Sequence, residues 1–506
     1  MAPDVTEAAA YVDLAIIGSG FAGLGAGVMA LEEGIDSFVI LERARAVGGT
    51  WRDNTYPGCA CDIPSHLYSF SFAQNPEWTR SYPAQPEIEE YLERVTDHFG
   101  LRSRIRFRFD VDSVTWDDAA GRWNITSCDG ERVFASAVIC ATGPLSQPTI
   151  PDIPGLDQFG GAVFHSASWR HDIDLEGRRV GVVGTGASAI QLVPEIVGTV
   201  AHLDVFQRTP PWVLPRDDRP SPAWRRRLYR RVPFLQRLHR WRIYLRQELL
   251  ATAFLGRGRV ARAMADRIKE ETKTMIAASF ADDAQAASLV PDYVPGCKRL
   301  LISNDWYPAI ARPEVSIVSA SIDRFDETGI VTADGHHHDL DVVIMATGFA
   351  VSSFPSPLTI IGRDGTDLRD HWSNGASTDF GLTVSGYPNL WFLAGPGTGL
   401  GHNSIIFMIE VQLQQIGAAL RHMRTKEVSV LELRPEIEAS SYAEVQRRIA
   451  RTVWSSGCSS WYVSDDGRVD TIWPGTTTEY WWRARRFDAD RYVETPGRFG
   501  AKIPDR

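Results

Sequence analysis

Two short glycine-containing turns are the parts of this chain best suited to hold a nucleotide. Residues 18–23 read G-S-G-F-A-G after an apolar run, and residues 184–189 read G-T-G-A-S-A after another. In such a turn the first glycine permits a sharp bend, the second lets backbone approach a pyrophosphate, and the third small residue lets the next helix pack on the strand. Two such turns on one polypeptide predict that two redox nucleotides meet.

The residues after the following strand differ between the two turns. The run at 37–41 ends at Glu42, where a carboxylate can accept hydrogen bonds from ribose hydroxyls, which suits FAD or NAD. The run at 201–206 is followed by Gln207 and Arg208. Because a guanidinium pairs well with a 2′-phosphate, the second site is predicted to prefer NADPH over NADH.

The elements that must position these turns follow from the hydrophobic pattern. Apolar runs at 14–17 and 37–41, and before Ala-Thr-Gly at both 141–143 and 346–348, are typical of buried parallel strands. Residues 105–125 alternate between apolar and polar, as antiparallel strands do. We therefore predict an α/β fold with two Rossmann-like dinucleotide-binding domains and an inserted helical subdomain.

The composition argues against several classes of protein. The chain has 53 basic and 63 acidic residues, so its net charge of −10 does not suit nucleic acid binding. We expect no transmembrane segment and no signal peptide, and a cytoplasmic location. The six cysteines lack the spacing of a zinc site, so we expect no metal and reduced thiols; Cys59 and Cys61 lack the C-x-x-C spacing of a redox pair.

A third motif extends from Gly48 to Asp62 and reads G-G-x-W-x-x-x-x-Y-P-G-x-x-x-D. With it, the sequence resembles the class B flavoprotein monooxygenases, and within them the type I Baeyer–Villiger monooxygenases that act on cyclohexanone, phenylacetone and 4-hydroxyacetophenone. The resemblance implies that Thr50, Trp51 and Tyr68 lie along the flavin, that Asp62 lies near its reactive edge, and that Val111 touches the adenine end of FAD.

A fourth motif, F-x-G-x-x-x-H-x-x-x-W, matches the fingerprint of the Baeyer–Villiger family at Phe159, Gly161, His165 and Trp169. The tryptophan distinguishes this family from the related N- and S-oxygenating enzymes, where Tyr or Phe is usual. The resemblance implies that His165 is a positioning or conformational residue, and we do not predict that it transfers a proton.

A fifth motif, Gly296-Cys297-Lys298-Arg299, carries two adjacent cations. By resemblance, Lys298 joins Arg208 around the 2′-phosphate and Arg299 reaches the flavin edge, with Asp62 orienting it. The expected catalytic residues are Arg299 and Asp62. The expected FAD residues are Gly18, Gly20, Gly23, Glu42, Gly49, Thr50, Trp51, Asp62, Tyr68 and Val111. The expected NADP residues are Gly184, Thr185, Gly186, Ala187, Ser188, Ala189, Gln191, Arg208, Thr209 and Lys298.

The motifs divide the chain into five expected segments. These are the first part of an FAD-binding domain (1–148), the first part of an NADP-binding domain (149–214), a helical insertion (215–292), the second part of the NADP-binding domain (293–372), and the return to the FAD-binding domain with an aromatic-rich tail (373–506). We expect the insertion to wall the substrate site and the tail to pack over it. The arginine-rich stretch 224–246 has the amphipathic character of peripheral membrane segments, which makes it a candidate for membrane contact.

The resemblance implies an FAD-containing monooxygenase that uses NADPH and O2. NADPH reduces FAD, oxygen adds at flavin C4a, and the resulting peroxyflavin attacks a small-molecule ketone to give an ester or lactone. Two alternatives remain open within the same fold: an N- or S-oxygenating flavin monooxygenase, and a flavin-dependent NADPH oxidase or reductase. A binding protein without activity would not need both Arg208 and Lys298.

Overall fold

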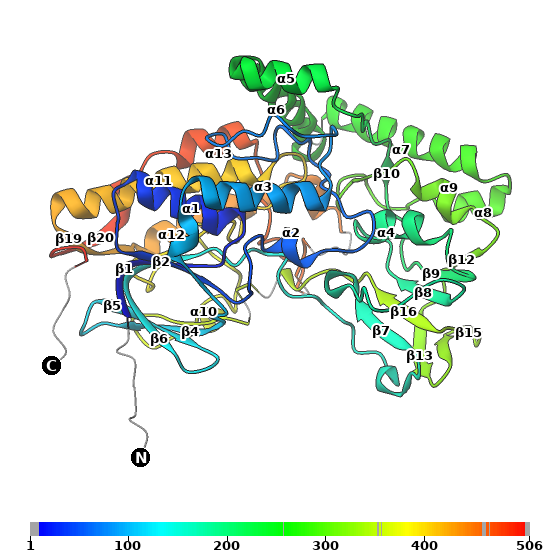
Figure 1. Ribbon diagram of the computed structural model, residues 1–506, viewed down its shortest axis with the longest axis horizontal. Helices are drawn as coiled ribbons and strands as arrows, with labels where there is room; N and C mark the ends of the chain where they lie inside the picture. The colour runs from blue at the N-terminus through cyan, green and yellow to red at the C-terminus, as the bar shows by residue number, and fades with distance from the viewer. Residues whose placement is uncertain are drawn as a thin grey trace.

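Two β-sheets with parallel cores form the two halves of the molecule, and a layer of helices lies across one side of it (Figure 1). The computed structural model describes residues 10–500, except 257, 352–353, 356, 458–461 and 465. The arrangement of parallel strands and helices confirms the predicted α/β class and its two Rossmann-like halves.

The first sheet has eight strands in the order β17-β4-β5-β6-β1-β2-β3, with β18 also paired to β6. Its strands are β1 (Ala10–Ile17), β2 (Phe38–Glu42), β3 (Ile105–Phe107), β4 (Val111–Asp117), β5 (Arg122–Ser127), β6 (Arg132–Cys140), β17 (Thr359–Ile361) and β18 (Leu390–Phe392). The expected antiparallel strands are the pairs β4–β5 and β5–β6. Because β17 pairs with β4, the chain has already returned to this sheet by residue 359, before the expected boundary at 372.

The helices packed with this sheet are α1 (Phe21–Glu32), α3 (Gln85–His98) and α11 (Ile405–Lys426). Ten residues of α1 are buried, because the helix lies between the sheet and α11. The short helices α2 (Thr50–Asp53) and α10 (Leu368–His371) lie in the connections. Burying each large apolar side chain contributes about 1.5–3 kcal/mol, so this near-continuous apolar helix fixes the position of the turn that precedes it.

The second sheet has five parallel strands in the order β12-β9-β8-β16-β7. They are β7 (Ala162–His165), β8 (Arg179–Val183), β9 (His202–Phe206), β12 (Val315–Val318) and β16 (Val342–Met345), with α4 (Ala189–Ile196) and α9 (Trp306–Ile310) packed beside them. An antiparallel sheet follows β12 and consists of β13 (Ile322–Asp326), β14 (Gly329–Thr332) and β15 (His337–Asp339).

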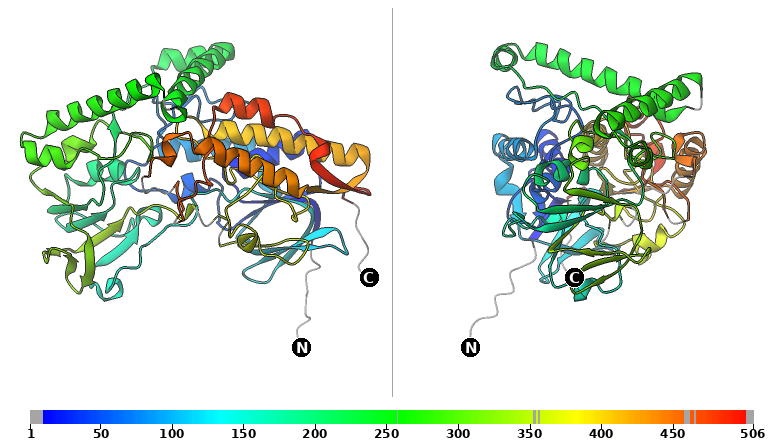
Figure 2. Two further views of the ribbon diagram at one scale, coloured as in Figure 1. Left: turned by 180° about the vertical axis from the view of Figure 1, so that it is seen from behind. Right: turned by 90° about the vertical axis from the view of Figure 1, so that its right-hand side faces the viewer.

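The inserted segment is helical, as predicted, and consists of α5 (Ala223–Arg231), α6 (Pro233–Leu255), α7 (Arg259–Ser279) and α8 (Asp283–Ser288). A short parallel pair, β10 (Val213–Leu214) with β11 (Leu301–Ile302), closes its base. Helices α5 to α7 lie along the upper side of the molecule in every view (Figures 1 and 2). Among the described residues, no helix combines the length and apolar character needed to cross a bilayer.

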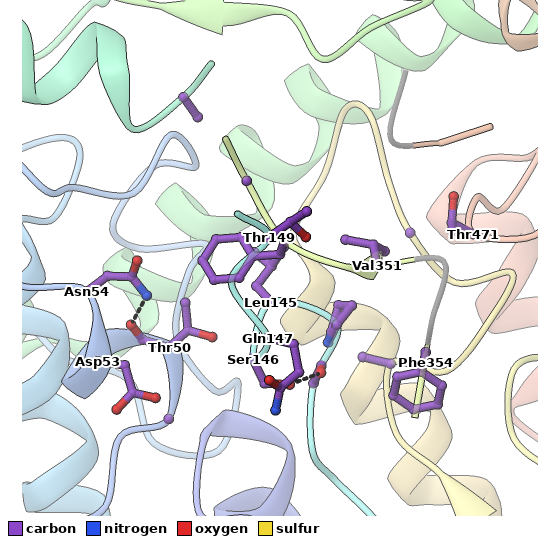
Figure 3. Close-up of a pocket in the computed structure, with 18 of the residues that line it drawn as sticks. Thr50, Asp53, Asn54, Leu145, Ser146, Gln147, Thr149, Val351, Phe354 and Thr471 are labelled. Carbon is purple, nitrogen blue, oxygen red and sulfur yellow. Dashed lines mark hydrogen bonds between the residues drawn. The ribbon is translucent and has the colours of Figure 1, made fainter. Parts of the chain in front are cut away.

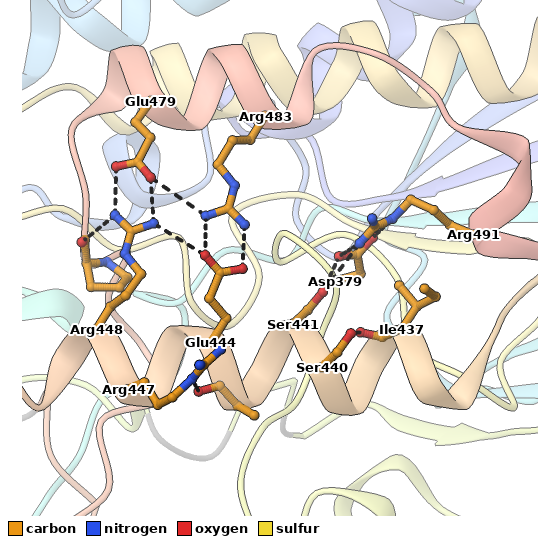
Figure 4. Close-up of polar contacts among 12 residues, drawn as sticks. Asp379, Ile437, Ser440, Ser441, Glu444, Arg447, Arg448, Glu479, Arg483 and Arg491 are labelled. Carbon is orange, nitrogen blue, oxygen red and sulfur yellow. Dashed lines mark hydrogen bonds and ion pairs between the residues drawn. The ribbon is translucent and has the colours of Figure 1, made fainter.

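The C-terminal region is held by ion pairs between its own elements. These elements are β19 (Val428–Leu433), α12 (Pro435–Ile449), α13 (Thr477–Ala484) and β20 (Tyr492–Pro496), of which β19 and β20 pair antiparallel. Arginines of α12 and α13 pair with carboxylates of the opposite helix, through Arg448 with Glu479 at 2.6 Å and Arg483 with Glu444 at 2.7 Å (Figure 4). Arg491 reaches the nearly buried Asp379 at 2.7 Å. These ion pairs hold α12 and α13 against each other and tie the chain before β20 to residue 379.

The cysteines differ in part from expectation. Cys59, Cys61, Cys128 and Cys140 are free thiols, but Cys297 is disulfide-bonded. The expectation of reduced thiols is therefore wrong for Cys297, which directly precedes Lys298.

Candidate active site

The two nucleotide turns have the same construction in the two sheets. Gly18 follows β1 and Gly184 follows β8, both with positive φ, at 102° and 108°. A Cβ on Gly18 would lie 2.7 Å from the carbonyl oxygen of Ala141, and one on Gly184 would lie 2.6 Å from that of Ala346. Both alanines open an Ala-Thr-Gly segment, so in each half the turn passes directly against that segment and only glycine fits there.

A helix begins directly after each turn, so each turn lies at the positive end of a helix dipole. Helix α1 begins after Gly20 and helix α4 after Ser188, and neither residue caps its helix with a side chain. The first N–H groups of a helix have no partner within it, and together with the helix dipole they favour an anion. Both turns therefore fit a pyrophosphate.

Glu42 is buried at the end of β2 and is held by four hydrogen bonds. One carboxylate oxygen accepts from the N–H and the hydroxyl of Ser19, at 2.9 and 2.6 Å. The other accepts from the Ala44 N–H and from Arg52, at 2.8 and 2.9 Å. These bonds tie the first turn to the end of β2 and orient the carboxylate where it borders the cavity described next.

One cavity of about 1450 Å³ connects both turns. A pocket for a single small ligand usually has about 300–1,000 Å³, so this cavity has room for more than one. Figure 3 shows part of its lining, which includes Thr50 and Asn54, residues 145–147 with Thr149, Val351 with Phe354, and Thr471.

Most of the residues expected at the cofactors line this cavity, and a few do not. Gly18, Gly20, Glu42, Gly49, Thr50, Trp51, Asp62, Tyr68 and Val111 line it on the side of the first turn. Gly184, Thr185, Gly186, Ala187, Ser188, Gln191, Arg208, Thr209 and Lys298 line it on the side of the second. Gly23, Ala189 and the four fingerprint residues are not part of the lining that the structure describes.

Arg299 and Asp62 form an ion pair within the cavity lining. The Nε and Nη2 atoms of Arg299 donate to one oxygen of Asp62, at 2.8 and 2.6 Å, and Nη1 lies 3.5 Å from the carbonyl oxygen of Leu400. The negative charge of Asp62 raises the pKa of Arg299 above its usual value, against the effect of burial. The pair therefore supplies a permanent cation in fixed orientation.

Arg208 and Lys298 place two cations together at another part of the lining. Burial lowers the pKa of Lys298, and the nearby charge of Arg208 lowers it further. The Lys298 ammonium also lies 4.9 Å from the centroid of the Tyr293 ring. An anion bound between two neighbouring cations offsets their repulsion and stabilises both charges, so this part of the cavity fits a phosphate.

The two halves meet through Gln191 of α4. Its side-chain oxygen accepts from the Tyr56 hydroxyl at 2.9 Å, and its side-chain nitrogen donates to the carbonyl oxygen of Ala60 at 3.0 Å. The indole N–H of Trp51, in the same motif as Tyr56, donates to the Tyr68 hydroxyl at 3.0 Å. The motif from Gly48 to Asp62 thus belongs to the first half but contacts the second.

The fingerprint residues surround β7 behind the cavity. Phe159 packs edge-to-face on Phe325, and Trp169 packs in the same way on Phe164, with centroids 5.9 and 5.2 Å apart. His165 ends β7, where Nδ1 accepts from the Ala167 N–H at 3.0 Å and the ring lies 5.8 Å from that of Phe349. Phe349 borders the cavity, so His165 lies directly behind a residue of the cavity wall.

Parts of the lining carried no recognised sequence motif. The segment 145–149, the residues Val351 and Phe354, and the tail residues Tyr462 and Thr471 all face the cavity. Burial raises the pKa of Tyr462 and the nearby charge of Arg299 opposes that shift, which places this tail residue beside the ion pair. The described lining residues include none from 215–292, so the expectation that the helical insertion walls this cavity is wrong.

The insertion contacts a cavity-lining residue through Glu248 of α6. One oxygen of Glu248 accepts from the Asn403 amide at 2.8 Å and the Thr477 hydroxyl at 2.6 Å, and the other accepts from the Thr478 N–H at 3.0 Å. Asn403 lines the cavity. Burial favours a raised pKa for Glu248, but hydrogen bonds from His402, Thr477 and Thr478 lower it below its usual value.

We expect Glu248→Ala to lower the free energy of unfolding by about 2 kcal/mol at pH 7, because hydrogen bonds to a charged group contribute about 1.5–3 kcal/mol. Since the folded-state pKa is depressed, this contribution is present above the unfolded value of 4.5 and is lost as the pH falls below it. Urea unfolding at several pH values measures the difference. An equal difference between wild type and variant at pH 7 and at pH 3 would contradict the assigned role.

The fold and the cavity are those of a protein that binds two dinucleotides side by side in one cavity. Residues 12–358 match the family model described as flavin-binding monooxygenase-like. A Baeyer–Villiger monooxygenase of Streptomyces coelicolor is 46% identical over 98% of this chain and 95% of its own length. Among solved structures, the cyclohexanone monooxygenase of Rhodococcus sp. Phi1 bound to NADP+ is 28% identical with a TM-score of 0.85, over 97% of this chain and all of that one. The OTEMO complex with FAD and NADP is 26% identical with a TM-score of 0.86, over 96% and 99%.

The chain therefore belongs to the flavin-binding monooxygenase-like family, and within it to the Baeyer–Villiger monooxygenases.

Proposed function

We propose that this chain oxidises a small-molecule ketone to an ester or lactone in the cavity between its two nucleotide turns. The reaction consumes one ketone, O2, NADPH and a proton, and it yields the ester or lactone, NADP+ and water. The observation that carries the proposal is the ion pair of Arg299 with Asp62, which fixes a cation inside a cavity that both turns border. FAD supplies, when bound, the acceptance of hydride from NADPH and the transfer of one oxygen atom from O2.

The lining residues divide between the two cofactors. We assign FAD to the side of Gly18, Glu42 and Trp51, and NADP to the side of Gly184, Arg208 and Lys298. The uncapped N-termini of α1 and α4 would hold the pyrophosphates, and the two cations would hold the 2′-phosphate of NADP.

Arg299 is proposed to stabilise negative charge on the reacting oxygen atoms. A fixed donor in a cavity screened from water stabilises such charge more strongly than water does, since it needs no reorganisation during the reaction. Asp62 acts on Arg299: it accepts from two of its nitrogens and so determines where the guanidinium points. Gln191 holds the two halves of the cavity at a fixed position relative to each other through its bonds to Tyr56 and Ala60.

Product analysis tests the proposal. The purified FAD-loaded protein is incubated with NADPH, ¹⁸O2 and a panel of cyclic and open-chain ketones, and the products are analysed by mass spectrometry. We expect esters or lactones that carry one ¹⁸O atom. Sulfoxide or N-oxide formation from sulfide and amine substrates without any ester would favour the N- or S-oxygenating alternative. Release of hydrogen peroxide equal to the NADPH consumed with every ketone would favour the oxidase.

Gly23→Ala is expected to weaken FAD binding about tenfold, because an added methyl group in a packed site costs about 1–3 kcal/mol. A Cβ on Gly23 would lie 1.8 Å from the carbonyl oxygen of Gly18, so the turn must move. Titration of the apoprotein with FAD measures the affinity. Gly186→Ala, in the second turn, is the matched control, since its Cβ meets nothing within 4 Å. Equal FAD affinity in the two variants would argue against FAD at the first turn.

We also propose the division into domains that the sequence suggested, with the return to the FAD-binding domain placed before β17, which pairs in the first sheet. A cytoplasmic location fits an enzyme that consumes NADPH, and we propose it for that reason.

A further inference from the structure

Helix α6 turns three residues with polar groups toward the body of the protein. Gln236, Arg240 and Tyr244 follow one another at intervals of four residues and are all buried. Gln236 donates to the carbonyl oxygen of Asn75 at 2.8 Å. One nitrogen of Arg240 donates to the carbonyl oxygens of residues 66, 67 and 69, at 2.8–3.1 Å. These bonds to the body of the protein determine which side of the helix faces outward.

The outer side of α6 is apolar. Phe234, Leu238, Trp241 and Leu245 recur at intervals of three and four residues, so they form one stripe along the helix. Their side chains are between 49% and 68% exposed. A surface helix normally turns its large apolar side chains to the core, and here four of them face solvent. Exposing such a stripe to water is unfavourable, which indicates that something covers it.

Arginines surround the stripe. The segment 223–255, which contains α5 and α6, has nine arginines and one acidic residue, Glu248, whereas the whole chain has a net charge of −10. Glu248 lies on the inner side and is occupied by Asn403 and Thr477. Arg237, Arg242 and Arg246 are exposed beside the stripe, and none of them takes part in an ion pair among the described residues. The surface that covers the stripe must therefore be anionic as well as apolar.

We propose that the outer side of α6 docks on the surface of an anionic lipid bilayer, with Phe234, Leu238, Trp241 and Leu245 in the interface and the arginines against the lipid headgroups. An exposed helix with Trp, Phe and Leu on one side and arginines along its edges has the composition of helices that lie in the membrane interface. The layer of α5 to α7 lies along one side of the molecule, so this side is free to meet a flat surface (Figures 1 and 2).

A second copy of the chain suits this surface less well. In a symmetric dimer the same patch faces itself, which would bring the exposed arginines of α6 against their counterparts. Such like-charge contacts destabilise an interface. An anionic bilayer meets both the apolar stripe and the positive charge.

Vesicle sedimentation with the FAD-loaded full-length protein tests the proposal. We expect the protein to sediment with vesicles of phosphatidylcholine that contain about one third phosphatidylglycerol, and to remain in solution with phosphatidylcholine alone. Raising the ionic strength to about 1 M, where charges are screened beyond about 3 Å, is expected to weaken binding.

Two variants separate the apolar and the electrostatic contributions. Arg237→Ala/Arg242→Ala is expected to weaken vesicle binding about 25-fold, since each arginine near an anionic surface contributes about fivefold. Leu238→Ser/Trp241→Ser is expected to abolish sedimentation. Ketone oxygenation should stay at the wild-type rate in both, because no described residue of 215–292 lines the cavity. Trp482→Ser, on α13, is the control for an exposed tryptophan, and Arg132→Ala/Arg178→Ala is the control for exposed arginines.

Three results would overturn the proposal: no sedimentation of the wild-type protein at any lipid composition, equal binding of the α6 variants and the controls, or equal binding to neutral and anionic vesicles. Analytical ultracentrifugation adds a further outcome. A dimer that disappears in Leu238→Ser/Trp241→Ser, without vesicle binding by wild type, would assign the stripe to a second copy of the chain.

Discussion

Replacing Arg299 with alanine is expected to lower ester formation about a thousandfold while NADPH is still consumed. Removing one fixed donor from a site where negative charge develops costs about 2.7–4 kcal/mol, or a factor of about 10²–10³. The loss falls at the upper end because Asp62 then remains in the cavity lining without its cation. The FAD side of the cavity is unchanged, so FAD should stay bound and be reduced by NADPH.

The measurement is the number of NADPH molecules consumed per ester formed, together with the hydrogen peroxide released. In Arg299→Ala we expect nearly all NADPH to appear as hydrogen peroxide. Arg299→Lys keeps the charge but cannot make both bonds to Asp62, so an intermediate ratio is expected. Arg312→Ala, which breaks a surface pair with Glu314, serves as the control and should behave as wild type. Ester formation by Arg299→Ala at a rate near wild type would show that this arginine has no part in the reaction.

Arg208→Ala is expected to lower kcat/KM for NADPH about a hundredfold and to leave the value for NADH within about twofold. Hydrogen bonds to a charged group contribute about 1.5–3 kcal/mol, and only NADPH carries the 2′-phosphate that Arg208 would bind. Steady-state kinetics with both coenzymes measure the ratio, with Arg312→Ala again as the control. An equal loss with NADPH and NADH would contradict the assignment of the 2′-phosphate to Arg208 and Lys298.

The neighbouring Lys298 gives the same part of the cavity a pH dependence. Burial and the charge of Arg208 lower the pKa of Lys298 below 10.5, so its positive charge is lost earlier than usual as the pH rises. We expect KM for NADPH to rise in the alkaline range, and to rise only at higher pH in Arg208→Ala, where the repulsion is absent.

The parts of the site that the sequence predicted are those built from local patterns. The turns after β1 and β8, and the assignment of opposite charges to Glu42 and Arg208, depend on residues within one strand-turn-helix unit, where spacing is enough. The meeting of Arg299 with Asp62 joins residues 237 positions apart, and only a family resemblance brought them together beforehand.

The parts that the sequence did not predict depend on tertiary packing. The segment 145–149 and Phe354 line the cavity because two connections pass over it, and nothing in their residue types indicates this. The orientation of α6 was also hidden, because its periodicity alone does not say which side faces the core. Arg240 and Gln236 determine that orientation through backbone carbonyls of residues 66–75, which belong to the other end of the sequence.

The absence of cavity-lining residues among the described part of 215–292 separates two properties of this protein. Under the proposed membrane docking, substitutions along the outer side of α6 are expected to change vesicle binding and to leave ketone oxygenation unchanged. Substitutions of cavity-lining residues such as Leu145 are expected to change oxygenation and to leave vesicle binding unchanged. Natural selection or a laboratory screen can therefore change membrane binding and ketone oxygenation through separate sets of substitutions.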